Sequence, residues 1–205
     1  GVVGVISPWN YPVSLALGPV AIALAAGNRV LLKPSELTPK TSQLLQEVLA
    51  EAYDSNLVSV VLGGSELGQA FAELPFDHLL FTGSTRVGQL VMQAAAKNLT
   101  PVTLELGGKS PTIVHESYPI EKAAERIAAG KWMNAGQTCI APDYVLVPEA
   151  QRSALIEAFQ RVIQRFYPTL KDNPDYTAIV SPSHWQRLRG YVEDAVGRGA
   201  RAVEL

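Results

Sequence analysis

Short apolar runs alternate with longer stretches of helical periodicity along the first half of the chain, and this alternation limits the folds it can adopt. The apolar runs have the composition of β-strands. They are Val2–Ile6, Arg29–Lys33, Leu57–Leu62, His78–Thr82 and Val102–Leu106. Strands that alternate with helices through short connections predict an α/β fold with a mostly parallel, doubly wound sheet. Ligands of such sheets bind beyond the carboxyl ends of the strands.

The pattern becomes less regular after Gly107, which indicates a second domain. Strand-like and helix-like segments still occur there, at Pro111–Val114, 120–128, Tyr144–Val147, 155–166 and Ser183–Val196. Ala202–Leu205 resembles the start of one more strand. We therefore expect a first domain over residues 1–104 and part of a second α/β domain over residues 105–205. Both ends of the chain look cut, since it starts with glycine rather than methionine, and we expect an internal fragment of a longer protein.

The composition excludes several classes of protein. The chain has 17 basic and 19 acidic side chains and a net charge of −2, whereas nucleic-acid binders show a basic surplus. One cysteine and three scattered histidines argue against a disulfide framework and against a metal site. Neither an apolar stretch long enough to span a membrane nor a signal peptide is visible. We therefore expect a cytoplasmic protein with no nucleic-acid partner, no membrane segment and no metal.

Glycines follow several of the strand-like runs, but they fail the standard nucleotide-binding templates. The segment Gly63–Gly68 has Ser65 where the dinucleotide fingerprint requires its second glycine. A phosphate loop is excluded as well, because Thr103 occupies the first glycine position ahead of Gly108–Ser110. The Gly-x-Ser-x-Gly motif of serine hydrolases does not occur. These templates therefore assign no function.

Three polar residues stand out, and each has a plain structural explanation beside a functional one. Asn10 follows the first strand between two prolines, where asparagine commonly forms a turn. Glu105 ends an apolar strand before two glycines, and it is either a solvent-facing carboxylate or a group with a chemical role. Cys139 lies in a loop after a helix, and a single cysteine is more often a small buried apolar residue than a nucleophile. Taken singly, these three residues decide nothing.

Five short segments around these residues resemble the aldehyde dehydrogenase superfamily. They are Pro8–Pro12, Lys33–Glu36, Phe81–Thr85, Glu105–Pro111 and Gly136–Cys139, in the family's order and at similar separations. Two further segments, Leu99–Leu104 and Cys139–Tyr144, look most like the class 3 branch, which includes fatty and aromatic aldehyde dehydrogenases. The coniferyl aldehyde dehydrogenases of bacteria are similar in the same places. The resemblance covers essentially the whole chain.

The resemblance implies a Rossmann-like domain that binds NAD(P) without the usual glycine signature, followed by part of a catalytic domain. In this family the Lys-Pro-Ser-Glu motif meets the adenosine ribose, which implies that role for Lys33 and Glu36. A glutamate at this place repels a 2′-phosphate, so NAD is expected over NADP, although the class 3 branch often accepts both. The other implied cofactor-binding residues are Gly63, Gly83, Ser84 and Leu106. The glycines could equally serve only the turns between strand and helix.

The implied reaction oxidises an aldehyde, either an aromatic one such as coniferyl aldehyde or an aliphatic one, to its carboxylic acid. Cys139 is the implied nucleophile, which forms a thiohemiacetal and then a thioester. Asn10 is the implied oxyanion donor, and Glu105 is the implied base that activates water. The parent protein is expected to be a homodimer. The fragment by itself is expected to be inactive, because the family's later Glu-x-x-Phe-Gly-Pro segment and its dimerisation strands are absent.

Three other interpretations stay open. An acylating enzyme passes the acyl group to coenzyme A instead of water, but such enzymes tend to lack the base implied at Glu105. A catalytically silent homologue keeps the fold and binds NAD without the reaction. An unrelated thiol hydrolase requires a histidine near Cys139, which the sequence cannot place there.

Overall fold

The computed structural model describes residues 1–204, which form two compact units. The first unit covers Gly1–Gly107, and the second begins at Gly108. The division falls after strand β5 (Val102–Leu106), so Glu105 and Leu106 belong to the first unit. The sequence placed these two residues in the second domain, and the difference arises because β5 pairs along its whole length with the first unit's sheet.

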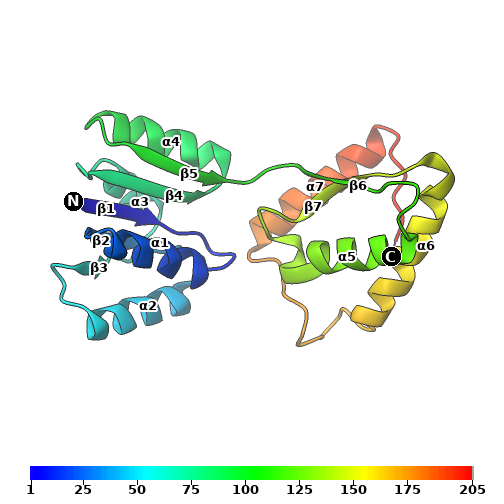
Figure 1. Ribbon diagram of the computed structural model, residues 1–205, viewed down its shortest axis with the longest axis horizontal. Coiled ribbons are helices and arrows are strands. Elements are labelled where there is room, and N and C mark those ends of the chain that lie inside the picture. The colour runs from blue at the N-terminus through cyan, green and yellow to red at the C-terminus, as the bar shows by residue number, and fades with distance from the viewer. Residues whose placement is uncertain (205) are drawn as a thin grey trace. The chain divides into compact units, whose positions relative to one another are not determined.

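The first unit is built on a parallel sheet of five strands (Figure 1). The other strands are β1 (Val2–Ile6), β2 (Arg29–Lys33), β3 (Val58–Val60) and β4 (His78–Gly83). Their order is β3-β2-β1-β4-β5, and every pairing is parallel. The predicted α/β fold with a parallel sheet is therefore confirmed. Strand β3 is shorter than the apolar run Leu57–Leu62 that predicted it.

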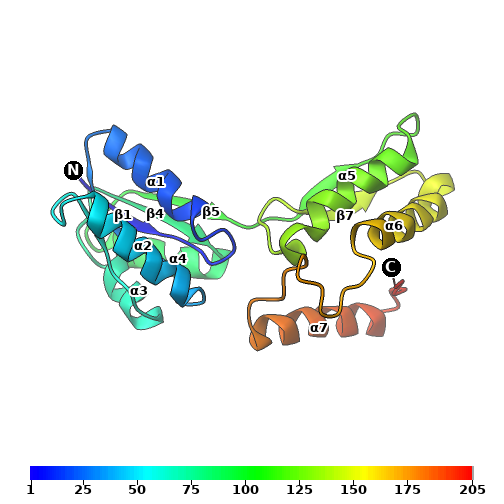
Figure 2. The same ribbon diagram turned by 90° about the horizontal axis from the view of Figure 1, so that it is seen from below.

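Helices cover both faces of this sheet (Figures 1 and 2). They are α1 (Ser14–Ala25), α2 (Pro39–Ala52), α3 (Ser65–Ala72) and α4 (Thr85–Ala96). Helices α1 and α2 share one buried cluster with Val5 and Leu32, whereas α3 and α4 share another with Leu79 and Phe81. Successive strand residues point to opposite faces, so Val5 lies in the first cluster and its neighbour Ile6 packs against the second. Burial on both faces explains why the strands read as continuous apolar runs.

The strand order reverses at β1, which lies between β2 and β4. Ile6, the last residue of β1, is in register with Lys33 of β2 and with Phe81 of β4. The carboxyl ends of these parallel strands therefore meet at one edge of the sheet. Ligands of doubly wound sheets bind in the crevice outside this edge, at the point of reversal. The fold thus directs attention to the residues that follow β1 and β4.

The second unit combines a two-stranded parallel sheet with packed helices. Strand β6 (Ser110–Ile113) pairs with β7 (Pro142–Leu146). Helix α5 (Ile120–Trp132) packs against α6 (Arg152–Phe166), as Figure 2 shows. The contact is close because Ala124 and Ala128 of α5 meet Ala158 of α6 with no side-chain exposure at all. Two short 3₁₀ turns, Met133–Gly136 and Glu149–Gln151, follow α5 and precede α6.

Helix α7 (Pro182–Gly197) follows α6 after a long loop and has no buried residue. It begins at the residue after Ser181, whose Oγ accepts a hydrogen bond from the N–H of His184 at 3.3 Å. The strand expected at Ala202–Leu205 is wrong for residues 202–204, which pair with no strand in the structure, and Leu205 lies outside the described residues. Apolar composition alone does not make a strand, because strand residues need a neighbour for their backbone hydrogen bonds. Among residues 1–204, no helix combines the length and apolarity needed to cross a membrane.

Candidate active site

The residues that the sequence singled out in the first unit gather at the carboxyl edge of its sheet. Asn10 follows β1, Lys33 ends β2, Gly63 follows β3, Gly83 and Ser84 lie at the end of β4, and Glu105 and Leu106 end β5. Strands β4 and β5 are in register with Gly83 opposite Leu106 and Thr82 opposite Glu105. Parallel pairing therefore brings together strand ends that are far apart in the sequence. Cys139 belongs to the second unit.

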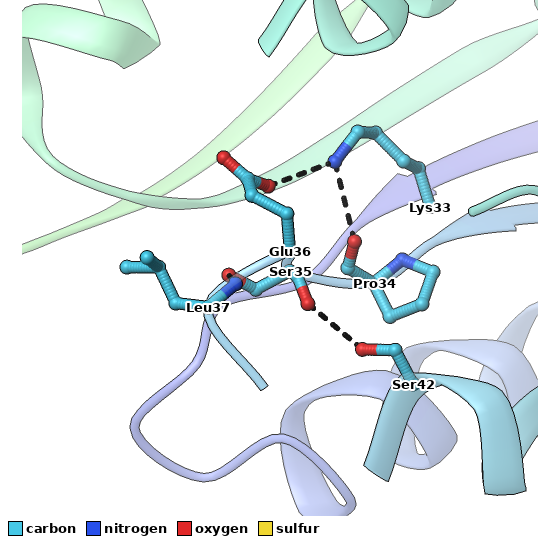
Figure 3. Close-up of polar contacts among 6 residues, drawn as sticks. All are labelled: Lys33, Pro34, Ser35, Glu36, Leu37 and Ser42. Carbon is cyan, nitrogen blue, oxygen red and sulfur yellow. Dashed lines mark hydrogen bonds and ion pairs between the residues drawn. The ribbon is translucent and has the colours of Figure 1, made fainter. Parts of the chain in front are cut away.

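Lys33 and Glu36 form an ion pair directly after β2 (Figure 3). The Lys33 ammonium lies 3.2 Å from Oε2 of Glu36, and it donates a hydrogen bond to the carbonyl of Pro34, also at 3.2 Å. The Lys33 side chain is only 4% exposed, whereas that of Glu36 is 47% exposed. The pair therefore presents its acidic member to solvent and keeps its basic member beneath the surface.

The turn that carries this pair is fixed by its own hydrogen bonds (Figure 3). The Ser42 hydroxyl, from the first turns of α2, donates to the carbonyl of Ser35 at 2.8 Å. The Ser35 hydroxyl in turn accepts from the N–H of Leu37 at 3.2 Å. Helix α3 packs over the aliphatic part of the Lys33 side chain, since a Cβ added at Gly68 would lie 3.5 Å from the Lys33 Cε. Lys33 and Glu36 are thus held in place before any ligand binds.

The polar groups at this edge fit the chemistry of a dinucleotide. A ribose diol can accept a hydrogen bond from the Lys33 ammonium and donate one to the Glu36 carboxylate. Helices α3 and α4 begin directly after Gly64 and Ser84, and the N–H groups at helix N-termini bind phosphates. Among residues 1–204, no group of three or more His, Cys, Asp or Glu side chains is placed to hold a metal ion.

The glycines and the serine at these helix starts also have structural roles. A Cβ added at Gly63 would lie 2.5 Å from Cδ2 of Leu67, and a Cβ added at Gly83 would lie 2.4 Å from Cζ of Phe81. Neither position leaves room for a side chain. Ser84 is the N-cap of α4, and its Oγ accepts a hydrogen bond from the N–H of Val87 at 3.3 Å. Packing and capping therefore explain these residue types, whether or not a cofactor touches them.

Asn10 lies in a bend between β1 and α1 and is half-buried. Its amide oxygen accepts a hydrogen bond from the N–H of Tyr11 at 3.1 Å. This bond is local, since its donor is the next residue in the chain. It also fixes the direction of the amide group, because the oxygen points back to the chain.

Glu105 is the exposed residue of β5. Of the two explanations that the sequence left open, a solvent-facing carboxylate at the end of the sheet describes its position. Its side chain is accessible to solvent and can reach a water molecule without any rearrangement of the strand.

Cys139 is exposed and lies in the loop between the 3₁₀ turn Met133–Gly136 and β7. The alternative that it is a small buried apolar residue is therefore wrong. The 3₁₀ turn that leads into this loop contains residues in the left-handed region: φ is +53° at Asn134, +54° at Ala135 and +74° at Gly136. This conformation costs an alanine roughly 1–2 kcal/mol, so neighbouring contacts must hold the turn in shape.

Gln137 supplies such contacts, and it was not among the residues predicted from the sequence. Its Nε2 donates to the carbonyl of Asn134 at 3.0 Å and to that of Ala178 at 3.1 Å. Its Oε1 accepts from the N–H of Val180 at 3.0 Å. The one signal in the sequence was its place inside the segment Gly136–Cys139, because two of its three partners lie about forty residues away along the chain.

A cavity of about 550 Å³ lies beside this loop in the second unit. Residues 134–141 are called the cysteine loop from here on. Ala135 of this loop lines the cavity together with residues from the segment 170–179. Tyr176 also faces it, and its ring packs edge-on against Tyr167 at 4.8 Å between centroids. Burial, and secondarily the neighbouring phenol of Tyr167, raise the pKa of Tyr176. Tyr176 is therefore a neutral hydrogen-bonding group at neutral pH.

The comparison with known families decides the identity of the chain. The model of the aldehyde dehydrogenase family matches residues 1–204. The chain belongs to the aldehyde dehydrogenase family. The resemblance that the five sequence segments carried is therefore confirmed, and so is the fold class.

Named relatives agree with this assignment. A Pseudomonas aeruginosa protein described as "probable coniferyl aldehyde dehydrogenase" is 60% identical over 205 residues, which are 100% of this chain and 43% of the relative. The bovine aldehyde dehydrogenase family 3 member B1 is 49% identical over 191 residues, 93% of this chain and 41% of the relative. The crystal structure of a Mycobacterium tuberculosis aldehyde dehydrogenase complexed with NAD⁺ matches with a TM-score of 0.90 at 36% identity, over 100% of this chain and 43% of that one. The chain thus spans less than half the length of these aldehyde dehydrogenases.

Proposed function

We propose that the protein to which this chain belongs oxidises an aldehyde to its carboxylic acid with NAD, through a thiohemiacetal and a thioester on Cys139. The observation that carries the proposal is the family match over residues 1–204. It is supported by an exposed Cys139, by the Lys33–Glu36 pair, and by the gathering of the other candidate residues at one edge of a doubly wound sheet.

The first unit is the proposed NAD-binding domain, and the second is part of the catalytic domain. Lys33 and Glu36 would hold the adenosine ribose, and the N-termini of α3 and α4, at Gly63, Gly83 and Ser84, would meet the pyrophosphate or the nicotinamide side. Leu106, half-buried at the end of β5, would line the same edge. Glu36 accepts hydrogen bonds from a free 2′-hydroxyl but repels a 2′-phosphate, which favours NAD over NADP. A solved relative with NAD⁺ bound supports this choice.

Cys139 and Asn10 would perform the first chemical step. The Cys139 thiolate attacks the aldehyde carbon and forms a thiohemiacetal. Negative charge then develops on the former aldehyde oxygen, where the Asn10 amide and the backbone N–H of Cys139 would donate hydrogen bonds. Removal of one such donor typically lowers the rate by about a hundred- to a thousandfold.

Glu105 would perform the second step. The chemistry that NAD would supply when bound is the acceptance of a hydride. Once the thiohemiacetal is oxidised, Cys139 carries the acyl group as a thioester. Glu105 then takes a proton from a water molecule, which attacks the thioester and releases the carboxylic acid and the free thiol. The exposure of Glu105 suits this role, because its carboxylate needs access to water.

The proposed substrate is an aromatic aldehyde such as coniferyl aldehyde, with aliphatic aldehydes as a second class. The Pseudomonas aeruginosa relative described as a probable coniferyl aldehyde dehydrogenase supports the choice of an aromatic substrate. A homodimeric parent protein and a cytoplasmic location complete the proposal. The chain alone is proposed to be inactive, since it holds less than half of its relatives' length.

Two substitutions in the full-length protein test the mechanism. Cys139→Ala should abolish NADH formation, because no nucleophile remains. Glu105→Gln should retain a burst of NADH equal to the enzyme concentration and then slow at least a hundredfold, with the acyl-enzyme visible by mass spectrometry. Glu51→Gln, an exposed glutamate on α2, is the matched control and should leave turnover unchanged. Normal turnover by both Cys139→Ala and Glu105→Gln would refute the assignment.

The same assay separates the alternatives. An acylating enzyme would form product only when coenzyme A is added, whereas the proposed enzyme releases free acid without it. A silent NAD-binding homologue would show no NADH burst with any aldehyde. A thiol hydrolase would consume an ester substrate without NAD.

A further inference from the structure

Both ends of the Gln137 amide are engaged, and this makes the residue more than a neighbour of Cys139. Its nitrogen donates to the carbonyls of Asn134 and Ala178, and its oxygen accepts from the N–H of Val180. The first bond lies within the cysteine loop, and the other two join that loop to a segment about forty residues further along the chain. One side chain therefore links two stretches of irregular backbone.

The cysteine loop depends on such a link because its own conformation is unfavourable. Asn134 and Ala135 have positive φ angles although neither is a glycine. Gly136 follows with φ +74°, and a Cβ there would lie 3.1 Å from the carbonyl oxygen of Lys131. The backbone N–H of Gln137 also donates to the carbonyl of Asn134, at 3.1 Å, which closes the turn. Two residues later the same backbone presents Cys139 to solvent.

The segment on the other side of the link has its own anchor. Val180 is followed by Ser181, the N-cap of α7, whose hydroxyl accepts from the N–H of His184 and lies 2.7 Å from Nδ1 of His184. A bond to Val180 therefore ties the cysteine loop to the start of a helix of sixteen residues. The hydrogen bonds of the loop therefore reach the start of a helix as well as its own turn.

We propose that Gln137 is a positioning residue for the Cys139 thiol: it fixes the loop that carries the sulfur by bonding it to Ala178 and Val180. This inference rests on the proposed role of Cys139 as nucleophile. Gln137 touches neither substrate nor cofactor in this proposal and acts through Cys139. The reason for a glutamine is chemical, because the position requires two donors and one acceptor on a single side chain.

Substitutions in the full-length protein, with NAD and coniferyl aldehyde, test the proposal. Gln137→Met keeps the length of the side chain and removes all three hydrogen bonds. Gln137→Glu keeps an acceptor for Val180 but loses both donors and sets a carboxylate against two carbonyl oxygens. Gln160→Met is the matched control, because Gln160 is a glutamine of the same unit whose amide donates only on the surface, to the carbonyl of Glu204 at 3.3 Å.

Three measurements distinguish positioning from mere stabilisation. The first is kcat per active site, with the sites counted as the folded fraction of the protein by circular dichroism. The second is the rate of alkylation of the Cys139 peptide by iodoacetamide, followed by mass spectrometry. The third is the KM for NAD. A misplacement of a reacting group by about 1 Å can cost a hundredfold in rate, so Gln137→Met and Gln137→Glu should each lower kcat per site at least tenfold. Both should change the alkylation rate at least threefold and leave the KM for NAD within twofold, while Gln160→Met stays at wild type in all three.

The result that overturns the proposal is a kcat per site and an alkylation rate at wild-type level in either Gln137 variant. A lower melting temperature with unchanged kcat per remaining site would show a structural role only, and so would overturn it as well. The failure of the proposed function is recognised separately by Cys139→Ala. If that variant still turns over, Cys139 is not the nucleophile; if it is dead while both Gln137 variants are normal, only the positioning role is wrong.

Discussion

Gly83→Ala tests whether packing, and not only a cofactor, requires a glycine at the end of β4. The Cβ that alanine adds at position 83 would lie 2.4 Å from Cζ of Phe81 and 3.0 Å from its Cε1. The clash follows from the strand itself, because residues 81 and 83 point to the same face. Phe81 is 4% exposed and packs in the cluster beneath α3 and α4, so its ring has no free space to enter.

The expected loss follows from the cost of overpacking. Forcing an extra carbon into a packed core destabilises a protein by about 1–3 kcal/mol. With a urea m-value of about 2 kcal/mol/M, this loss lowers the urea midpoint of the first unit by about 0.5–1.5 M. The assay is urea unfolding of the 205-residue chain, followed by circular dichroism.

Gly190→Ala supplies the control for the same chemical change. Nothing lies within 4 Å of a Cβ added at Gly190, which is exposed in the interior of α7. Alanine is favoured over glycine in a helix by about 1 kcal/mol, so this variant should unfold at the same or a higher urea concentration. In a Phe81→Leu background, the loss caused by Gly83→Ala should shrink by at least half, because the shorter side chain leaves room. Equal midpoints for Gly83→Ala and wild type, or an undiminished loss beside Phe81→Leu, would refute the steric reasoning.

Two further predictions concern the proposed cofactor edge. Glu36→Gln removes the charge that repels a 2′-phosphate, so in the full-length protein the ratio of KM values, NADP over NAD, should fall at least fivefold; an unchanged ratio would place Glu36 away from the 2′ position. Ser84→Ala removes the hydrogen bond between the Ser84 Oγ and the N–H of Val87 and should lower the free energy of unfolding by about 1 kcal/mol, whereas Ser84→Thr, which keeps a hydroxyl, should lose less than half of that. Equal losses in the two Ser84 variants would show that the cap does not contribute.

Local periodicity was sufficient to predict most elements of the fold. The strands Val2–Ile6, Arg29–Lys33 and Val102–Leu106 begin and end where the apolar runs do. They were predictable because strands covered by helices on both faces are mostly apolar, which is a property of neighbouring residues in the sequence. The strand expected at Ala202–Leu205 shows the limit of this argument, since residues 202–204 have the composition without a pairing partner.

The candidate site was predictable only where short segments carried it. Lys33 and Glu36 lie three positions apart on one turn, and their ion pair follows from local geometry. Glu105 was predictable from its segment. Its exposure to solvent was not, because it depends on the face of the sheet to which this residue of β5 points. Gln137 was missed because its partners at 178 and 180 lie about forty residues away and belong to no recognisable pattern.

The sequence by itself determined which residues form strands and helices, which of them follow strand ends, and to which family the chain is similar. Tertiary structure decided the order β3-β2-β1-β4-β5, the division of the chain after Gly107, and the anchoring of the cysteine loop to Ala178 and Val180. The physical reason is the distance along the chain over which each kind of interaction acts. Periodicity and turn chemistry act between residues a few positions apart, whereas strand pairing and side-chain bonds between loops depend on which distant segments the folded chain brings into contact.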